Sequence, residues 1–261
     1  MRYLIPLSIL ALSCSATVNA QQSETRQWFN SIEYNTLENT DLDYDSTQLS
    51  SHYYFTPQQN TGVWDDYGYL DTDSNIDLHY FESDGHDNFS LYGEGFYGNW
   101  FVIAELSDLS NLDNYSVGAG YLFNDSLKAS VRMQEYEYGD EVYWFKAQYN
   151  HQLNDSDYIG FTIETNDDTD IWNTSSRYFS HLGDDRYFSL DVDYQGNDAN
   201  NTLSAMANYY FNRNVAIGAG ATDSDLQLEA KYFINSQYYL TANFTDYDSG
   251  DLYTVKFVAQ F

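Results

Sequence analysis

Cysteine, proline and basic residues are all scarce in this sequence of 261 residues, which contains 1 Cys, 2 Pro and 10 Lys or Arg. The lone Cys14 has no second cysteine with which to form an intrachain disulfide. The 10 basic residues stand against 40 Asp and Glu, so the net charge is −30. Such acidity excludes nucleic acid as a partner, and it excludes attachment to anionic lipid through charge.

The first twenty residues are the only long apolar stretch, and the rest of the chain has no run near the roughly 20 apolar residues of a membrane helix. Residues 1–20 combine an early arginine, an apolar run and a small-x-small ending at Ala20. This pattern predicts a secretory signal peptide cleaved after Ala20. Lipid attachment at Cys14 is the alternative, but Ala11 stands where such a site usually has Leu. We expect residues 21–261 to form one domain.

Aromatic residues are abundant, with 27 Tyr, 16 Phe and 5 Trp, although chains of such high charge are often disordered and poor in aromatics. Helical periodicity is almost absent, and apolar residues instead alternate with polar ones in segments about fifteen residues apart. This alternation predicts β-strands with one apolar and one polar face. The clearest segments are 115–123, 127–133, 143–149, 159–163, 188–194, 203–211, 215–219, 226–232, 238–244 and 253–261. Weaker ones lie near 28–34, 49–55, 76–80, 89–97, 100–106 and 175–182.

The connections between these segments alternate between two kinds. One kind is short and follows an aromatic residue or Leu, as in "YLFNDS", "HQLNDSD", "YYFNRN" and "KYFINSQ". The other is acidic and often longer, as in "LENTDLDYD", "LSDLSNLDN", "TNDDTDIWNTSS" and "DYDSGD". Strict alternation is typical of an up-and-down meander whose two ends face different compartments. The segments predict an all-β, antiparallel, transmembrane β-barrel of about 16 strands, with 12 or 14 as alternatives.

A soluble β-sandwich is the alternative fold, and the apolar faces decide against it. They mix small residues with aromatics, where a close-packed core would favour bulky branched side chains. The opposite faces are polar and often charged, which fits an enclosed wet lumen. Aromatic residues also gather at strand ends beside the short turns, where a membrane barrel has its interfacial girdle. These girdle candidates are Phe55, Tyr97, Phe123, Phe211 and Phe233.

The final segment "LYTVKFVAQF" alternates strictly and ends on Phe261. Together with the signal peptide and the strand pattern, it resembles the outer-membrane β-barrels of Gram-negative bacteria. In that class an aromatic C-terminal residue on the last strand is part of the signal for the barrel-assembly machinery. The resemblance therefore implies an assembly role for Tyr253, Val255, Phe257 and Phe261. It also implies periplasmic chaperones, lipid and lipopolysaccharide as partners.

The segment "YYFNRNVAIGAGATDSDLQLEAKYFIN" more narrowly resembles the general porins of gammaproteobacteria, which repeat such a turn before a glycine-rich strand. This narrower likeness covers about residues 201–261. Trimeric general porins are usually longer and carry a long loop folded into the channel. No connection in this sequence has the length expected of such a loop. Constriction of the pore by such a loop therefore stays open, and so does the choice between a monomer and a homotrimer.

The polar phase of the strands is expected to line the pore. It carries opposed basic and acidic side chains, typical of a selectivity lining, although ion pairs filling a narrow interior are the alternative. A barrel of 16 strands should enclose a water-filled channel. The predicted pore-lining residues are Lys128, Arg132, Lys146, Arg177, Lys231, Lys256, Glu94, Glu164, Asp191 and Glu229.

Other chemistry finds little support in the sequence. The five histidines are scattered over different segments, and no Gly-x-Ser-x-Gly motif or metal-ligand spacing accompanies them. The acidic runs at 41–45, 167–170 and 246–251 could bind Ca²⁺, but none has the EF-hand spacing. A solvated acidic rim, bridged by divalent ions to lipopolysaccharide, is the favoured interpretation. We expect neither a metal site nor a cofactor, and no enzymatic activity.

The sequence thus predicts an outer-membrane porin that allows passive diffusion of small hydrophilic solutes and ions. Because the inward charges nearly cancel and the connections hold most of the acidic surplus, we expect a preference for cations. A non-conducting structural or adhesive barrel is the alternative, and an enzymatic barrel is less favoured.

Overall fold

The computed structural model describes residues 25–39, 44–197 and 199–261. The predicted signal peptide, Asp41 and Asp43 lie outside these residues. No helix among the described residues is long and apolar enough to cross a membrane. The described chain contains 16 strands: β1 (Thr25–Asn39), β2 (Tyr44–Gln59), β3 (Asn75–Ser83), β4 (His86–Tyr97), β5 (Trp100–Leu106), β6 (Tyr115–Asn124), β7 (Leu127–Glu135), β8 (Val142–Gln152), β9 (Tyr158–Asn166), β10 (Ile171–Gly183), β11 (Arg186–Asn197), β12 (Asn201–Asn212), β13 (Val215–Thr222), β14 (Asp225–Phe233), β15 (Tyr238–Tyr247) and β16 (Gly250–Gln260).

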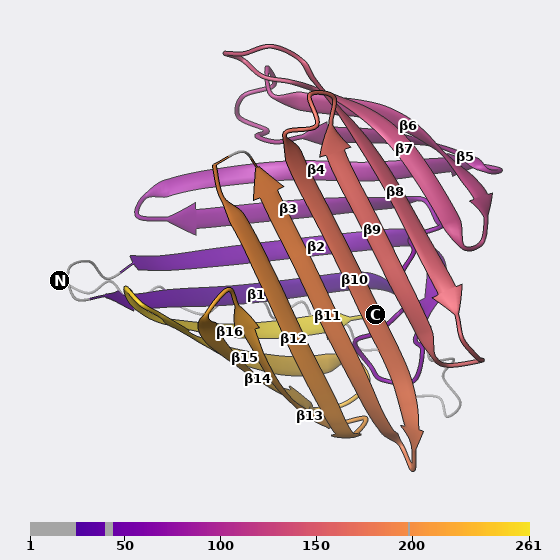
Figure 1. The fold of residues 1–261 in the computed structure, drawn as a ribbon, viewed down its shortest axis with the longest axis vertical. Helices are drawn as coiled ribbons and strands as arrows, with labels where there is room; N and C mark the ends of the chain where they lie inside the picture. The colour runs from indigo at the N-terminus through magenta and orange to yellow at the C-terminus, as the bar shows by residue number, and fades with distance from the viewer. Residues whose placement is uncertain (1–24, 40–43, 198) are drawn as a thin grey trace.

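The strands form one closed barrel in which each pairs with its neighbour in the chain, and β1 pairs antiparallel with β16 (Figure 1). The closing register runs from Phe29 opposite Gln260 to Asn39 opposite Gly250. At its last residue, the backbone N–H of Phe261 donates to the carbonyl oxygen of Trp28 at 2.8 Å. The predicted number of strands and the up-and-down order are confirmed. Of the six weaker segments, 100–106 is β5 and 175–182 lies inside β10.

The short turns share an asparagine that begins a local hydrogen-bonded turn. The side-chain oxygens of Asn124, Asn154, Asn212 and Asn235 each accept a hydrogen bond from the backbone N–H two residues later, at 2.7–2.9 Å. Asparagine can satisfy the backbone in this way where the chain must reverse. The recurring "FN" and "LN" signatures therefore mark one turn geometry repeated around one end of the barrel.

The two kinds of connection lie at opposite ends of the barrel. The termini end carries both chain ends of the described barrel and the turns after the even-numbered strands. The acidic end carries the turns after the odd-numbered strands. Its eight connections each contain Asp or Glu and contain no Lys or Arg; they are 40–43, 84–85, 107–114, 136–141, 167–170, 198–200, 223–224 and 248–249.

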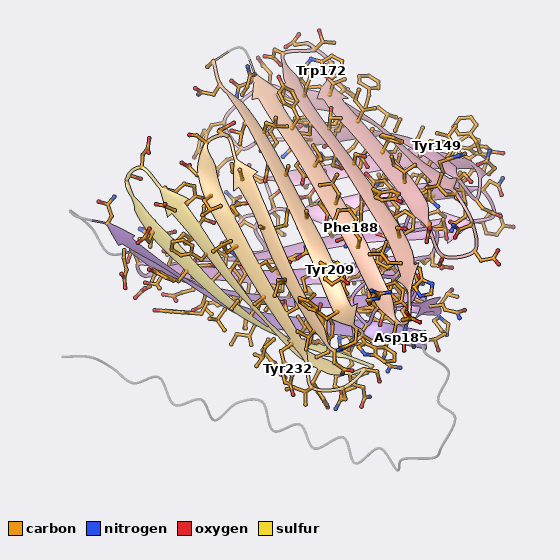
Figure 2. All side chains as sticks on the ribbon, turned by 60° about the horizontal axis from the view of Figure 1, so that its bottom comes forward. Tyr149, Trp172, Asp185, Phe188, Tyr209 and Tyr232 are labelled. Carbon is orange, nitrogen blue, oxygen red and sulfur yellow. The ribbon has the colours of Figure 1, made fainter. Side chains whose placement is uncertain are left out.

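The outer face of the barrel is apolar. Large hydrophobic side chains stay exposed along most strands, for example Ile217 at 51 % and Val255 at 52 %, and a lipid phase would cover them. Figure 2 shows Tyr149, Phe188, Tyr209 and Tyr232 on this outer surface. Of the expected girdle residues, four are exposed in this way: Phe55, Tyr97, Phe123 and Phe211.

The prediction for Phe233 is wrong. Its side chain is 1 % exposed and packs inside the barrel, whereas the preceding Tyr232 is 58 % exposed. Side chains of a strand alternate between the two faces, so Phe233 shares the inward phase of Lys231 and Glu229. The girdle residue at this strand end is Tyr232.

Candidate functional site

The ten residues predicted to line the pore lie on the inner face, and most of the basic ones are bound to carboxylates. Lys256 pairs with Glu33 at 3.4 Å, Arg177 with Asp191 at 3.4 Å and Lys231 with Glu229 at 3.4 Å. Lys128 is 3 % exposed and pairs with Glu94. Arg132 bridges Glu105 and Glu164, at 3.0 and 3.6 Å.

Lys146 differs from these side chains. Within the described ranges it forms neither an ion pair nor a hydrogen bond. Glu164 lies directly opposite it in the register of β8 and β9, but the carboxylate of Glu164 is turned toward Arg132. Lys146 is therefore an uncompensated positive charge on the inner wall.

The connection between β2 and β3, residues 60–74, folds into the barrel from the termini end; we call it the inner segment. Val63 and Asp66 are 0 % and 1 % exposed, so this part of the connection is fully enclosed. The prediction that no connection is long enough to fold into the channel is therefore wrong. The lumen is occupied at this end instead of being open water throughout.

Apolar packing fixes the first half of the inner segment. Val63 belongs to a buried cluster contributed by strands β9 to β14, with Trp64 and Tyr69 packed against it. The strand members of this cluster are Tyr158, Phe179, Tyr187, Tyr210, Ala216 and Phe233. Such a cluster excludes water and stabilises the segment by burial of apolar surface.

Acidic residues of the inner segment reach polar partners on the wall. Asp65 pairs with Lys231 at 2.9 Å, and both side chains are largely buried, at 6 % and 13 % exposure. The hydroxyl of Tyr158 donates to Asp66 at 2.8 Å. Both carboxylates are thus compensated inside the barrel, as buried charges must be.

Further contacts join the inner segment to other sides of the lumen. The Tyr69 hydroxyl lies 2.8 Å from the hydroxyl of Thr162 on β9. On the far side, Lys128 of β7 donates to the carbonyl oxygen of Asp71 at 3.0 Å. Gln260 of β16 donates to the carbonyl oxygen of Trp64 at 2.6 Å. The segment therefore spans the lumen rather than lying along one wall.

The sequence does contain a signal for this segment, although pattern reasoning missed it. Residues 60–74 read "NTGVWDDYGYLDTDS", which places Val63, Trp64 and two tyrosines in a connection. Apolar and aromatic side chains in a long connection must be buried somewhere, because exposure to water would be unfavourable. The partners for Asp65 and Asp66 could not be foreseen, since they come from strands more than ninety residues away.

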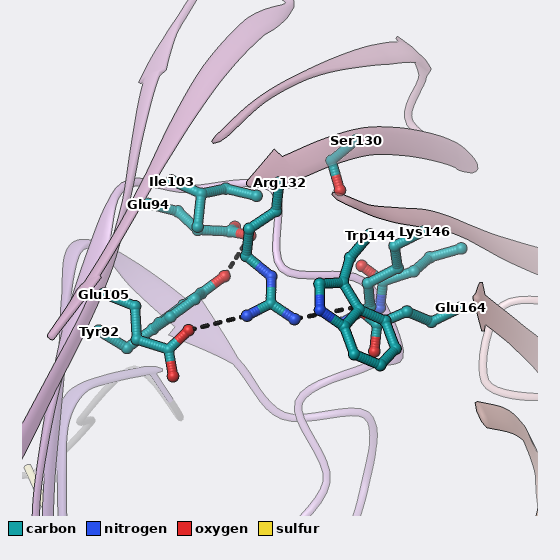
Figure 3. A pocket seen from close by; sticks show the side chains of 10 residues that line it. Tyr92, Glu94, Ile103, Glu105, Ser130, Arg132, Trp144, Lys146 and Glu164 are labelled. Carbon is teal, nitrogen blue, oxygen red and sulfur yellow. Dashed lines mark hydrogen bonds and ion pairs between the residues drawn. The ribbon is translucent and has the colours of Figure 1, made fainter. Parts of the chain in front are cut away.

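A cavity of about 250 Å³ lies against the inner wall of β4 to β9 (Figure 3). Arg132 crosses it between Glu105 on one side and Glu164 on the other, and its guanidinium carbon lies 5.7 Å from the ring centre of Trp144. Lys146 also lines the cavity. The full lining is Tyr92, Glu94, Ile103, Glu105, Ser130, Arg132, Trp144, Lys146, Gln148 and Glu164.

The residues with an expected assembly role lie along β16 and at its end. Tyr253 and Val255 are exposed on the outer face, at 40 % and 52 %. The Phe257 ring stacks on Tyr238 with centroids 6.1 Å apart, and Phe261 makes an edge contact with the same tyrosine. These contacts close the outer surface between β15 and β16. Their part in assembly stays a prediction.

The histidines and acidic runs form no metal centre in the part of the chain that the structure describes. No group of three or more His, Cys, Asp or Glu there is arranged to hold an ion. His79 instead contacts Asp77 at 2.8 Å, with His52 3.9 Å from the same carboxylate.

Solved structures of porins share this fold. The Acinetobacter baumannii outer membrane protein Omp33 aligns with 92 % of this chain and 100 % of its own, with a TM-score of 0.61 and 13 % identity. A triple mutant of Rhodopseudomonas blastica porin covers 90 % and 99 %, with a TM-score of 0.54 and 11 % identity. No curated protein sequence matches the chain.

A family described as "Putative general bacterial porin" matches residues 1–261. The match spans both the signal-like leader and the whole barrel, and the closed barrel of 16 strands is the architecture of channel proteins of the Gram-negative outer membrane. The chain belongs to the family of general bacterial porins.

Proposed function

We propose that this porin provides passive diffusion for small hydrophilic solutes and ions and prefers cations. One observation carries the proposal: the eight connections of the acidic end contain no Lys or Arg and each contains Asp or Glu. Lumen cations, by contrast, are mostly paired with carboxylates. The connections of the acidic end hold 14 Asp or Glu, against nine Asp and one Arg in those of the termini end, so the excess of negative charge is larger at the acidic mouth.

We assign the acidic end to the outside of the cell and the termini end to the periplasm. In this family of barrels short turns face the periplasm and longer loops face outward. A negative mouth concentrates cations and repels anions over about a Debye length, roughly 10 Å at 0.1 M salt. Cations would enter from a locally enriched layer before they meet the charge-paired lumen.

The inner segment would limit this flux at the periplasmic end. It fills space that a barrel of 16 strands would otherwise leave to water. We therefore expect a smaller conductance than an unobstructed barrel of this size would give. Cation preference, set at the opposite mouth, should not depend on the inner segment.

Reversal potentials of the purified barrel in planar bilayers test the proposal. A salt gradient centred near 0.1 M should give a potential of the sign for cation preference. The preference should shrink near 1 M salt, where the Debye length is about 3 Å. A preference for anions would refute the role of the acidic mouth and would favour selectivity set by the lumen lysines.

The inner segment also favours a second candidate, a non-conducting barrel with a structural or adhesive role. Its contacts with opposite walls could close the path entirely. Absence of any conductance from folded, inserted protein would support this candidate over the porin. Folding is checked independently by the slower electrophoretic migration of unheated barrel.

A further inference from the structure

The cavity around Arg132 is lined by an acidic group and a lysine whose charges are not fully paired by the residues that the structure describes. Glu105 and Glu164 share the single guanidinium of Arg132, which leaves this group with one negative charge in excess. Lys146, which lies opposite Glu164 in the register of β8 and β9, carries a positive charge that no described residue pairs with. The two excess charges line the same cavity (Figure 3).

We propose that this cavity binds small zwitterions of the α-amino acid class. The carboxylate of the solute would pair with Lys146, and its ammonium group would be accepted by Glu105 and Glu164. Charge-assisted hydrogen bonds of this kind are among the stronger polar contacts. The inference extends the proposed function by giving the solute path a binding site.

The volume of the cavity limits the size of the solute. At about 250 Å³ it lies below the roughly 300–1,000 Å³ typical of sites for drug-sized molecules. Ile103 and the Trp144 ring provide an apolar part of the lining, while Ser130 and Gln148 provide neutral hydrogen-bonding groups. This combination fits a short side chain attached to a charged backbone.

The net charge favours a zwitterion over a simple anion. Glu94, the third carboxylate of the lining, is already neutralised by Lys128. An anion at Lys146 would leave the excess charge of the Glu105 and Glu164 pair uncompensated, and a cation would leave Lys146 uncompensated. A solute with both charges can pair with Lys146 and with the Glu105 and Glu164 group at once, so the cavity should discriminate among solutes of equal size.

Three probes of similar size separate these cases: L-alanine, propionate and ethylammonium. We would titrate each into the folded barrel in neutral detergent and follow Trp144 fluorescence, with Trp144→Phe to assign the signal and calorimetry as a second readout. L-alanine should bind most tightly. Saturable binding of none of the three, or equal binding of all three, would overturn the proposal.

Two variants should shift the preference in opposite directions. Lys146→Gln should weaken L-alanine binding about tenfold while sparing ethylammonium, and Lys146→Arg should retain it. Glu164→Gln should weaken L-alanine and strengthen propionate. A general loss of structure would weaken all three probes together, so the opposite shifts identify a ligand contact.

Lys256→Gln is the matched control, because Lys256 also faces the lumen but is paired with Glu33 and does not line the cavity. It should leave L-alanine binding unchanged. Equal effects of Lys146→Gln and Lys256→Gln would refute the site. Binding is measured without a membrane, so the two proposals can fail separately. A barrel that binds L-alanine but does not conduct would refute the proposed function and keep this site. A barrel that conducts but does not bind L-alanine would refute the site and keep the proposed function.

Discussion

The two ends of the barrel are built by opposite means. The termini end has short turns held by asparagine side chains, a buried apolar cluster and an inner segment fixed by the ion pair of Asp65 with Lys231. The acidic end has connections without a basic residue and an excess of carboxylates. Packed side chains fill the lumen at the termini end, whereas unbalanced carboxylates dominate the connections of the acidic end.

The contrast separates two properties that a channel must control. Packing at the termini end sets how much space is available, because a dry cluster admits no water. Under the proposed function, charge at the acidic end would set which ions are concentrated, because a field acts without contact. Changes at one end should therefore alter conductance and leave selectivity, and changes at the other should do the reverse.

Removing the inner segment should have the largest effect. Replacement of residues 60–74 by an Asn-Gly turn would free the space now filled by Val63, Trp64 and Tyr69. We expect single-channel conductance to rise severalfold while the reversal potential keeps its sign. The same Asn-Gly replacement of residues 136–141, at the acidic end, is the matched control and should change conductance little. Unchanged conductance in the first variant would contradict the proposal that the inner segment restricts flux through the channel.

Breaking the ion pair between Asp65 and Lys231 should come next. Lys231→Met leaves the Asp65 carboxylate buried without its cation, which costs about 3–5 kcal/mol for buried pairs. The inner segment should then leave its position, seen as faster hydrogen exchange over residues 60–74. The double variant Asp65→Asn/Lys231→Met should recover much of the protection, since the buried Asp65 charge is removed and only Glu229, at 15 % exposure, loses its cation.

Lys256→Met is the control for this pair. Lys256 is 38 % exposed and its pairing with Glu33 is open to water, so the loss should be about 0–1 kcal/mol. Equal effects of Lys231→Met and Lys256→Met would show that lumen charge, rather than the contact with the inner segment, holds the segment in place.

A smaller effect is expected from Gly160→Ala. A Cβ atom at Gly160 would overlap the ring of Tyr69, whose hydroxyl contacts Thr162 at 2.8 Å. Overpacking of this kind costs about 1–3 kcal/mol and should raise hydrogen exchange near Tyr69 only. Gly95→Ala is the control, because its Cβ would meet Val102 at an ordinary 3.5 Å. Full protection of Tyr69 in Gly160→Ala would contradict the tight contact.

The strands were predictable from sequence because alternation is a local property. The six lysines and arginines of the predicted lining could be assigned to the lumen by counting in twos along their strands, as for Lys256 beside Val255. The error at Phe233 arose because its aromatic side chain suggested a girdle position. Tyr232 and Phe233 are consecutive residues of one strand, so their side chains point to opposite faces and only one of them can face outward.

The inner segment and the cavity depended on information that is not local. Contacts such as Asp65 with Lys231 arise only when the barrel has closed and strands far apart in sequence face each other. Lys146 was assigned to the lumen from its phase, but no described residue pairs with it because the carboxylate of Glu164 is turned toward Arg132. Alternation predicts which face of the barrel wall a side chain occupies. Which neighbour it contacts on that face depends on packing.

The smallest predicted effect compares one carboxylate from each end. Burial alone would raise the pKa of Asp157, in the β8–β9 turn, but hydrogen bonds from the His181 N–H, Asn154, Ser156 and Ser180 lower it overall. At the acidic end, hydrogen bonds from the Ser110 hydroxyl and N–H lower the pKa of the exposed Asp108.

Because both pKa values are depressed in the folded state, each ionised carboxylate stabilises its turn above the ordinary Asp pKa of about 3.9, and this is lost as pH falls through the folded value. The amide shifts of His181 and Ser110 should report the two titrations, each with a midpoint below about 3.9. Asp157→Asn should loosen the β8–β9 turn at neutral pH, with the difference from wild type fading in acid. Asp108 is exposed and its carboxylate is bonded by Ser110 in the same connection, so Asp108→Asn should loosen its turn less. A larger effect at Asp108 would mean that the acidic end, too, is maintained by local contacts rather than by its summed field.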